Sequence, residues 1–196
     1  MVRILALDVA KNATGWAFLA GDMSAPSWGT YHTLDWSKKS CGREMVKWRQ
    51  WLAEQITKFQ ITGLAVEEIF VNANPRMFDF SGTQAQMMLA AHAIEMCETA
   101  GIPVYEINIK HWRESGLGFS TKSKDAGKDR MFWKRHACAA AAKRDWYIPL
   151  DEHDAAEALW IADYTVAQLD RNYKLLTSHH RGRQVADIIH KRGLHA

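Results

Sequence analysis

The stretch Ile4-Leu5-Ala6-Leu7-Asp8 is a short apolar run that ends in an acid. Short apolar runs bounded by polar residues are typical of buried β-strands. Two β-compatible stretches follow at 15–20 and 28–34, separated by turn-forming residues, which predicts a three-strand antiparallel meander. The terminal Asp8 is unusual, because a bare buried carboxylate loses much hydration energy unless it is paired or binds a cation.

The rest of the chain alternates between helical and strand periodicity. Apolar residues at three- and four-residue steps predict helices over 44–59, 83–100 and 151–169, and β-compatible runs predict strands over 64–70 and 103–107. Residues 108–135 are polar and predict a loop that leads into a helix near 130–144. This order of elements predicts an α/β fold, with a mixed sheet and helices on both of its faces.

The net charge of +3 is the sum of segments whose charges differ strongly. Residues 171–196 hold six Lys or Arg against one acid, and residues 108–135 hold eight against three. We therefore expect one domain over 1–170 and a basic C-terminal tail over 171–196. Basic segments neutralise phosphates, so DNA is an expected partner, although a solvated loop and a frayed tail would carry the same charge.

Other features of the sequence bear on localisation. The three cysteines, Cys41, Cys97 and Cys138, show no metal-ligand spacing and cannot all pair, which favours a reducing compartment. No apolar run reaches the roughly 18 residues that a membrane span needs. The N-terminus also lacks the pattern of a secretory signal, so we expect a cytoplasmic protein without a membrane partner.

Further acids stand beside apolar segments. Glu67 and Glu68 interrupt a predicted strand, and Asp154 and Glu157 lie three residues apart on one face of the last predicted helix. Each acid alone has an ordinary explanation, as a strand-end, edge or helix N-terminal residue. Acids that converge from two strands and one helix would repel one another unless cations held them. Carboxylate sites of this kind suit Mg²⁺ or Mn²⁺.

These motifs resemble the RuvC-like Holliday-junction resolvases of bacteria and their phages. The resemblance rests on Ile4-Leu5-Ala6-Leu7-Asp8 with Thr14-Gly15-Trp16-Ala17, on Ala65-Val66-Glu67-Glu68-Ile69-Phe70, and on His153-Asp154-Ala155-Ala156-Glu157-Ala158-Leu159. Pro103-Val104-Tyr105-Glu106 and Trp112-Arg113 look like the phage-type branch. The resemblance implies a ribonuclease H-like fold, a homodimer, and metal-dependent cutting of branched DNA that leaves 5′-phosphate and 3′-hydroxyl ends. It also implies a role in DNA recombination, repair or phage DNA processing.

The resemblance implies roles for single residues. Asp8, Glu67, Asp154 and Glu157 would be the catalytic metal ligands for Mg²⁺, which Mn²⁺ would replace, and Asp151 and His153 are alternative ligands on the helix. Lys128 would be the basic active-site residue, with Lys110 and His111 as rivals. Phe70 would meet an unpaired base at the crossover. The remaining DNA contacts would come from Lys110, Arg113, Lys122, Lys124 and Arg130.

The chain departs from the family pattern at two places. Val9-Ala10 stands where the family commonly has Pro-Gly, and Glu157 stands where it usually has Asp. The residues also leave other functions open: a ribonuclease H-like nuclease for RNA–DNA hybrids or flaps, a catalytically silent DNA-binding module, and an actin-like sugar kinase or ATPase. The last of these usually needs a second nucleotide-binding lobe, which 196 residues hardly accommodate.

Overall fold

A computed structural model describes residues 1–22, 24–33, 41–69, 80–122, 129 and 131–174. Its five strands are β1 (Arg3–Asp8), β2 (Ala13–Ala20), β3 (Ser27–His32), β4 (Gly63–Glu67) and β5 (Val104–Ile107). They form one mixed sheet in the order β3-β2-β1-β4-β5. β1, β2 and β3 pair antiparallel, whereas β4 pairs parallel with both β1 and β5. The predicted meander and mixed sheet are confirmed.

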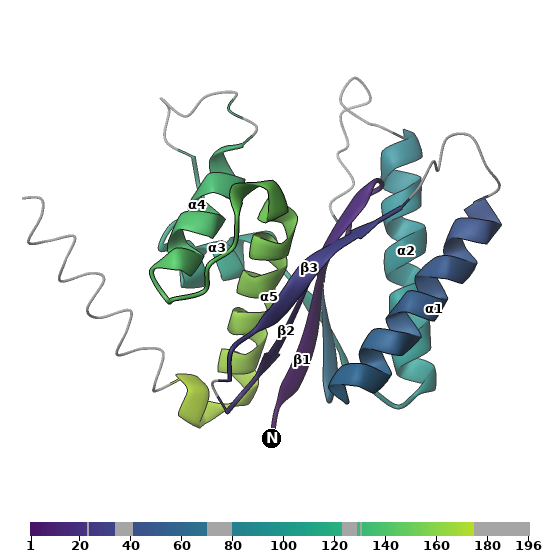
Figure 1. Ribbon diagram of the computed structural model, residues 1–196, viewed down its shortest axis with the longest axis horizontal. Helices are drawn as coiled ribbons and strands as arrows, with labels where there is room; N and C mark the ends of the chain where they lie inside the picture. The colour runs from purple at the N-terminus through teal and green to yellow at the C-terminus, as the bar shows by residue number, and fades with distance from the viewer. Residues whose placement is uncertain (23, 34–40, 70–79, 123–128, 130, 175–196) are drawn as a thin grey trace, which may run out of the picture.

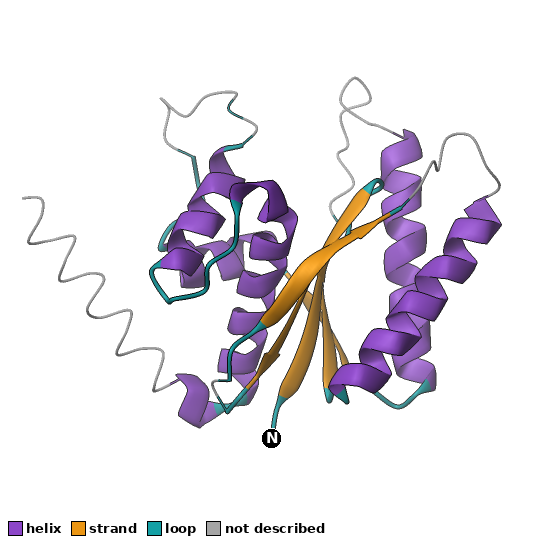
Figure 2. Cartoon of the chain, viewed as in Figure 1, coloured by secondary structure: helices purple, strands orange, loops and turns teal. Residues whose placement is uncertain are grey.

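Helices cover both faces of the sheet (Figures 1 and 2). One face is covered by α1 (Cys41–Phe59) and α2 (Phe80–Thr99), and the other by α3 (Ile109–Leu117), α4 (Phe132–Ala142) and α5 (His153–Leu169). Side chains of β1 alternate between these two layers, because successive residues of a strand point to opposite faces. Among the described residues, no helix is long and apolar enough to cross a membrane.

One prediction from the sequence is wrong: the polar segment that begins at Asn108 is partly helical. The side chain of Asn108 accepts a hydrogen bond from a backbone N–H of the first turn of α3, and Gly118 ends the helix with a φ of 84°. α3 has only nine residues, and Trp112 is its one buried residue. Gly116 lies inside the helix, where a Cβ would overlap a buried tryptophan ring of α5.

The first turn of α5 lies directly against the sheet. A Cβ on Gly15 of β2 would overlap the backbone carbonyl of Asp154, so this approach requires glycine. Gly15 is also the partner of Asp8 in the β1–β2 register. The start of α5 is therefore held beside the end of β1, at the edge of the sheet where two of the predicted acids lie.

The chain after α5 begins by packing on the domain. Tyr173 is buried, and its hydroxyl donates a hydrogen bond of 2.6 Å to Asp163 of α5. The backbone N–H groups of Asn172 and Tyr173 donate to the Asp170 carboxylate. The rest of the predicted tail, 175–196, lies outside the described residues.

Candidate active site

Acids from three elements meet at one edge of the sheet. Asp8 ends β1 and Glu67 ends β4, and these strands are parallel neighbours, so both acids stand at the same edge. Asp154 and Glu157 come from the first turns of α5. Carboxylate oxygens of Asp8, Asp154 and Glu157 lie within 4.8 Å of one another. The structure thus brings together residues that stand nearly 150 positions apart in the sequence.

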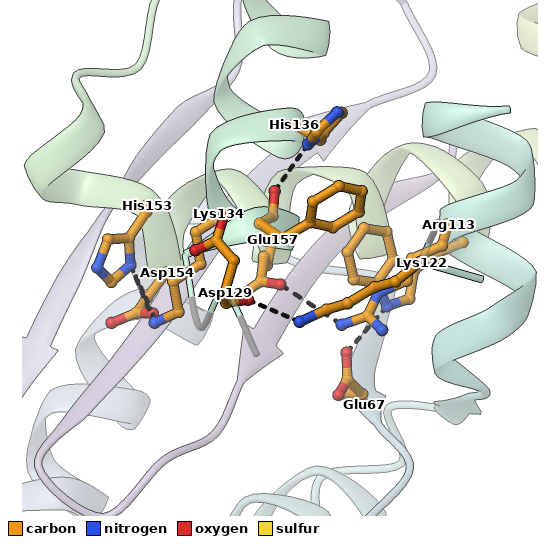
Figure 3. Close-up of polar contacts among 11 residues, drawn as sticks. Glu67, Arg113, Lys122, Asp129, Lys134, His136, His153, Asp154 and Glu157 are labelled. Atoms are coloured by element: carbon orange, nitrogen blue, oxygen red, sulfur yellow. Dashed lines mark hydrogen bonds and ion pairs between the residues drawn. The ribbon is translucent and has the colours of Figure 1, made fainter. Parts of the chain in front are cut away.

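Glu67 stands at the margin of this group (Figure 3). Its Oε2 accepts a hydrogen bond of 2.9 Å from Nε1 of Trp112. Burial and the charge of Asp8 raise its pKa to about 7. Its neighbour Glu68 is exposed and accepts a hydrogen bond of 2.7 Å from the Asn108 side chain. Of the two consecutive acids, Glu67 alone belongs to the site.

Burial and mutual repulsion make the acids hard to ionise. The pKa of Asp8 lies well above its ordinary value, first because of burial and then because of the charges of Glu157 and Asp154. Burial and the charge of Glu67 raise the pKa of Glu157 to about 7. A divalent cation would relieve this repulsion, and an all-carboxylate donor set suits a hard ion such as Mg²⁺ or Mn²⁺. The donors present therefore fit a metal centre.

Two cationic side chains reach the acids from the helices of the same layer (Figure 3). Nζ of Lys134, on α4, donates a hydrogen bond of 2.6 Å to Oδ1 of Asp154 and lies 3.2 Å from Nδ1 of His153. Nη2 of Arg113, on α3, lies 3.7 Å from Oε1 of Glu157. The Arg113 side chain is only 13% exposed, and its Nε is buried without a hydrogen-bond partner among the described residues.

Lys134 is a residue of the candidate site that the sequence did not single out. The sequence places it in a basic stretch, but the resemblance favours Lys128, which lies outside the described residues. A helical signal was available, because Lys134 precedes three buried small residues of α4 by three, four and seven positions, namely Ala137, Cys138 and Ala141. This spacing puts Lys134 on the face of α4 that packs against α5.

The rival candidates for the basic residue lie elsewhere on α3. Lys110 is exposed, and only its backbone N–H bonds to the Asn108 side chain. His111 lines a cavity of about 420 Å³ together with Tyr164 and Gln168 from the C-terminal half of α5. The acids occupy the opposite end of that helix, so His111 is separated from them.

The remaining predicted residues are placed as follows. Arg113, predicted to contact DNA, lies within the acid cluster, and Lys122 is exposed, with its Nζ donating to the backbone carbonyl of Asp129 at 2.7 Å. Asp151 is exposed in the turn before α5. Nδ1 of His153 lies 2.8 Å from Oδ1 of Asp154, next to the cluster. The predicted residues that lie outside the described part of the chain are Phe70, Lys124, Lys128 and Arg130.

Comparison with known proteins finds Holliday-junction resolvases among the proteins to which this chain is similar. The chain matches no protein-family model. It is 29% identical over 119 residues to the crossover junction endodeoxyribonuclease RuvC of Ehrlichia chaffeensis, covering 60% of this chain and 72% of that protein. Its fold resembles Thermus thermophilus RuvC bound to a Holliday junction substrate, with a TM-score of 0.59, 13% identity, and coverage of 87% and 97% of the two chains. It also resembles the yeast mitochondrial Holliday junction resolvase, with a TM-score of 0.52, 14% identity, and coverage of 91% and 84%. These matches confirm the resemblance to RuvC-like resolvases and the α/β fold.

Proposed function

We propose that this protein is a metal-dependent endodeoxyribonuclease that resolves four-way DNA junctions. The observation that carries the proposal is the convergence of Asp8, Asp154 and Glu157 within 4.8 Å, with Glu67 beside them. The pKa values of Asp8, Glu67 and Glu157 are raised, and acids that stand close together with raised pKa values are typical of functional sites. The similarity to a protein named crossover junction endodeoxyribonuclease supports junction DNA as the substrate.

The chemistry follows from the donors and the two cations. Asp8, Glu67, Asp154 and Glu157 would hold two Mg²⁺ ions, which Mn²⁺ would replace; such ions activate a water and stabilise the leaving 3′-oxygen. Cleavage would then leave 5′-phosphate and 3′-hydroxyl ends. Lys134 and Arg113 place positive charge beside the acids, where it stabilises the charge that develops on a phosphate under attack.

Two cuts at a two-fold branched substrate require two active sites, so we propose that the protein acts as a homodimer. The exposed face of α2 is the surface that we propose as the dimer interface. Met87 and Ala91, one turn apart on that helix, are both exposed. Charged substitution at Met87 should shift sedimentation equilibrium towards the monomer, whereas a wild-type protein that is monomeric at working concentrations would contradict the proposal.

The substrate is tested by comparing DNA structures in the presence of Mg²⁺. We expect cleavage of a four-way junction at a rate well above that of linear duplex, and none after addition of a chelator. Asp154→Asn should abolish cutting, and Asp151→Asn, a change of the exposed acid three residues earlier, should preserve it. Faster cutting of an RNA–DNA hybrid or a flap would assign the site to another kind of ribonuclease H-like nuclease. Junction binding without metal-dependent cleavage would indicate a catalytically silent module.

A further inference from the structure

Four aromatic rings form a cluster between the end of α3 and the start of α4. This aromatic cluster consists of Phe119, Phe132, Trp133 and His136. The rings of Phe119 and Trp133 are stacked with centroids 5.4 Å apart, and those of Phe132 and His136 lie 4.3 Å apart. Phe132 and Trp133 meet edge to face at 5.1 Å, which ties the two pairs together.

Packing of the fold does not account for this cluster. None of the four rings belongs to either hydrophobic core of the described residues. His136 is exposed, and the other three are partly exposed. The buried face of α4 is instead made of small residues, Ala137, Cys138 and Ala141. A group of large apolar rings left in contact with solvent is typical of a binding surface.

The cluster adjoins the acids through Arg113. The guanidinium of Arg113 lies 4.1 Å from the centroid of the Trp133 ring, and its Nη2 is 3.7 Å from Glu157. Lys134, the residue after Trp133, bonds to Asp154. The aromatic cluster therefore lies directly beside Arg113 and Lys134, the two cations that contact the acids.

More positive charge surrounds the cluster on its other side. Nζ of Lys122 lies 5.6 Å from the centroid of the Phe132 ring. Arg135 is exposed and paired with Asp129. Aromatic faces bordered by cations bind unpaired nucleobases, because the rings stack on the base while the cations neutralise the backbone. Paired bases do not offer their faces in this way.

We propose that the aromatic cluster is a subsite for an unpaired nucleobase next to the scissile phosphate. This inference rests on the proposed function for its location, and it adds a second stacking surface to the one expected at Phe70. It commits to single-stranded or unstacked DNA as the occupant. It also identifies Phe132 and Trp133 as the residues that select an opened base over a paired one.

The test uses the full chain with single-stranded oligonucleotides, linear duplex, and a four-way junction that carries 2-aminopurine beside the cleavage position. We expect Phe132→Leu and Trp133→Leu each to weaken single-strand binding roughly tenfold and to lower the 2-aminopurine fluorescence change on binding. Duplex affinity should stay unchanged. Trp133→Phe, which keeps a ring, should retain most of the binding, and Tyr147→Leu, at a 77% exposed position beyond α4, is the matched control.

The outcomes separate this inference from the proposed function. Folded Leu variants, judged by circular dichroism and thermal melting, that bind single strands and report 2-aminopurine like the wild type would overturn the subsite. If Trp133→Leu does not fold, Phe132→Leu together with Trp133→Phe gives the same comparison. Loss of single-strand binding in a protein that cuts no branched DNA would sustain the subsite and refute the proposed function. Normal junction cutting by Leu variants that still bind single strands like the wild type would support the proposed function and refute the subsite.

Discussion

Helix α5 carries acids in its first turns and one buried acid in its second half, and the surroundings of these acids differ. Asp163, in the second half, is fully buried, and it accepts hydrogen bonds from Nη1 of Arg144 at 2.5 Å and from the Tyr173 hydroxyl at 2.6 Å. Asp154 and Glu157, in the first turns, stand beside two more acids; Asp154 contacts Lys134 and His153, and Glu157 contacts Arg113.

This difference distinguishes a structural site from a binding site. At Asp163 the fold itself supplies the opposite charge, and the rings of Trp146 and Trp160 lie about the Arg144 guanidinium at 4.9 Å each. At the other end of the helix, the acids outnumber the cations, and the pKa values of Asp8, Glu67 and Glu157 are raised. Because these acids are not fully neutralised by protein cations, they favour the binding of a metal ion.

The largest expected effect on stability comes from removing the ion pair between Arg144 and Asp163. Arg144→Met leaves Asp163 buried with one charged partner fewer, which should cost about 3–5 kcal/mol in the free energy of unfolding. Urea denaturation at neutral pH measures this cost. Lys143→Met changes the adjacent exposed residue and should cost almost nothing. A loss below about 1 kcal/mol for Arg144→Met would show that the pair contributes little.

The opposite result is expected for the cation at the other end. Lys134→Met should lower junction cleavage roughly 100-fold, because positive charge beside the reacting phosphate is lost. Its effect on unfolding should be much smaller than that of Arg144→Met. Lys143→Met, at the residue that follows α4, again serves as the control. Near-normal turnover by a folded Lys134→Met protein would remove Lys134 from the active site.

The smallest effect concerns pH and the metal-free protein. Glu67 and Glu157 have pKa values of about 7 in the fold, raised from 4.5. A raised acid pKa means that the native state holds its proton more tightly than the unfolded chain, so stability falls as pH rises from about 4.5 to 7 and then levels off. We expect the free energy of unfolding of the metal-free protein to be lower at pH 7 than at pH 5.

This pH dependence is measured by thermal melting of the protein in the absence of divalent ions. Glu67→Gln should flatten the curve, and Glu68→Gln, at the exposed neighbouring position, should leave it unchanged. Saturating Mg²⁺ should restore stability at the alkaline side, because the ion binds the native acids. Metal-free stability that rises between pH 5 and 7 would contradict the raised pKa values.

Much of the fold follows from local patterns in the sequence. The apolar run at 4–7, the β-compatible stretches after it and the strongly periodic helices are read directly from residue spacing, and the structure has them at nearly the predicted places. α3 was missed because its signals are a side-chain cap at Asn108, a left-handed glycine at 118 and a single buried residue, Trp112. None of these produces an apolar period.

The acids of the candidate site could also be predicted from local sequence patterns. A carboxylate at the end of an apolar run, such as Asp8, stands out without any structure. Lys134 did not stand out, and Arg113 was predicted only as a DNA contact, because each belongs to a stretch rich in Lys and Arg and only packing shows which cation turns inward. The aromatic cluster also depends on the meeting of α3 with α4, which no local pattern encodes.

The central claim is that the buried acids at the ends of β1 and β4 and at the start of α5 cut DNA with bound metal. It is tested most directly by junction cleavage in Mg²⁺ by Glu67→Gln and Glu68→Gln. These changes are chemically identical and adjacent, yet only Glu67 is turned into the site. We expect Glu67→Gln to lose at least about 100-fold in rate while remaining folded, and Glu68→Gln to cut like the wild type. Equal rates for the two variants would contradict the account.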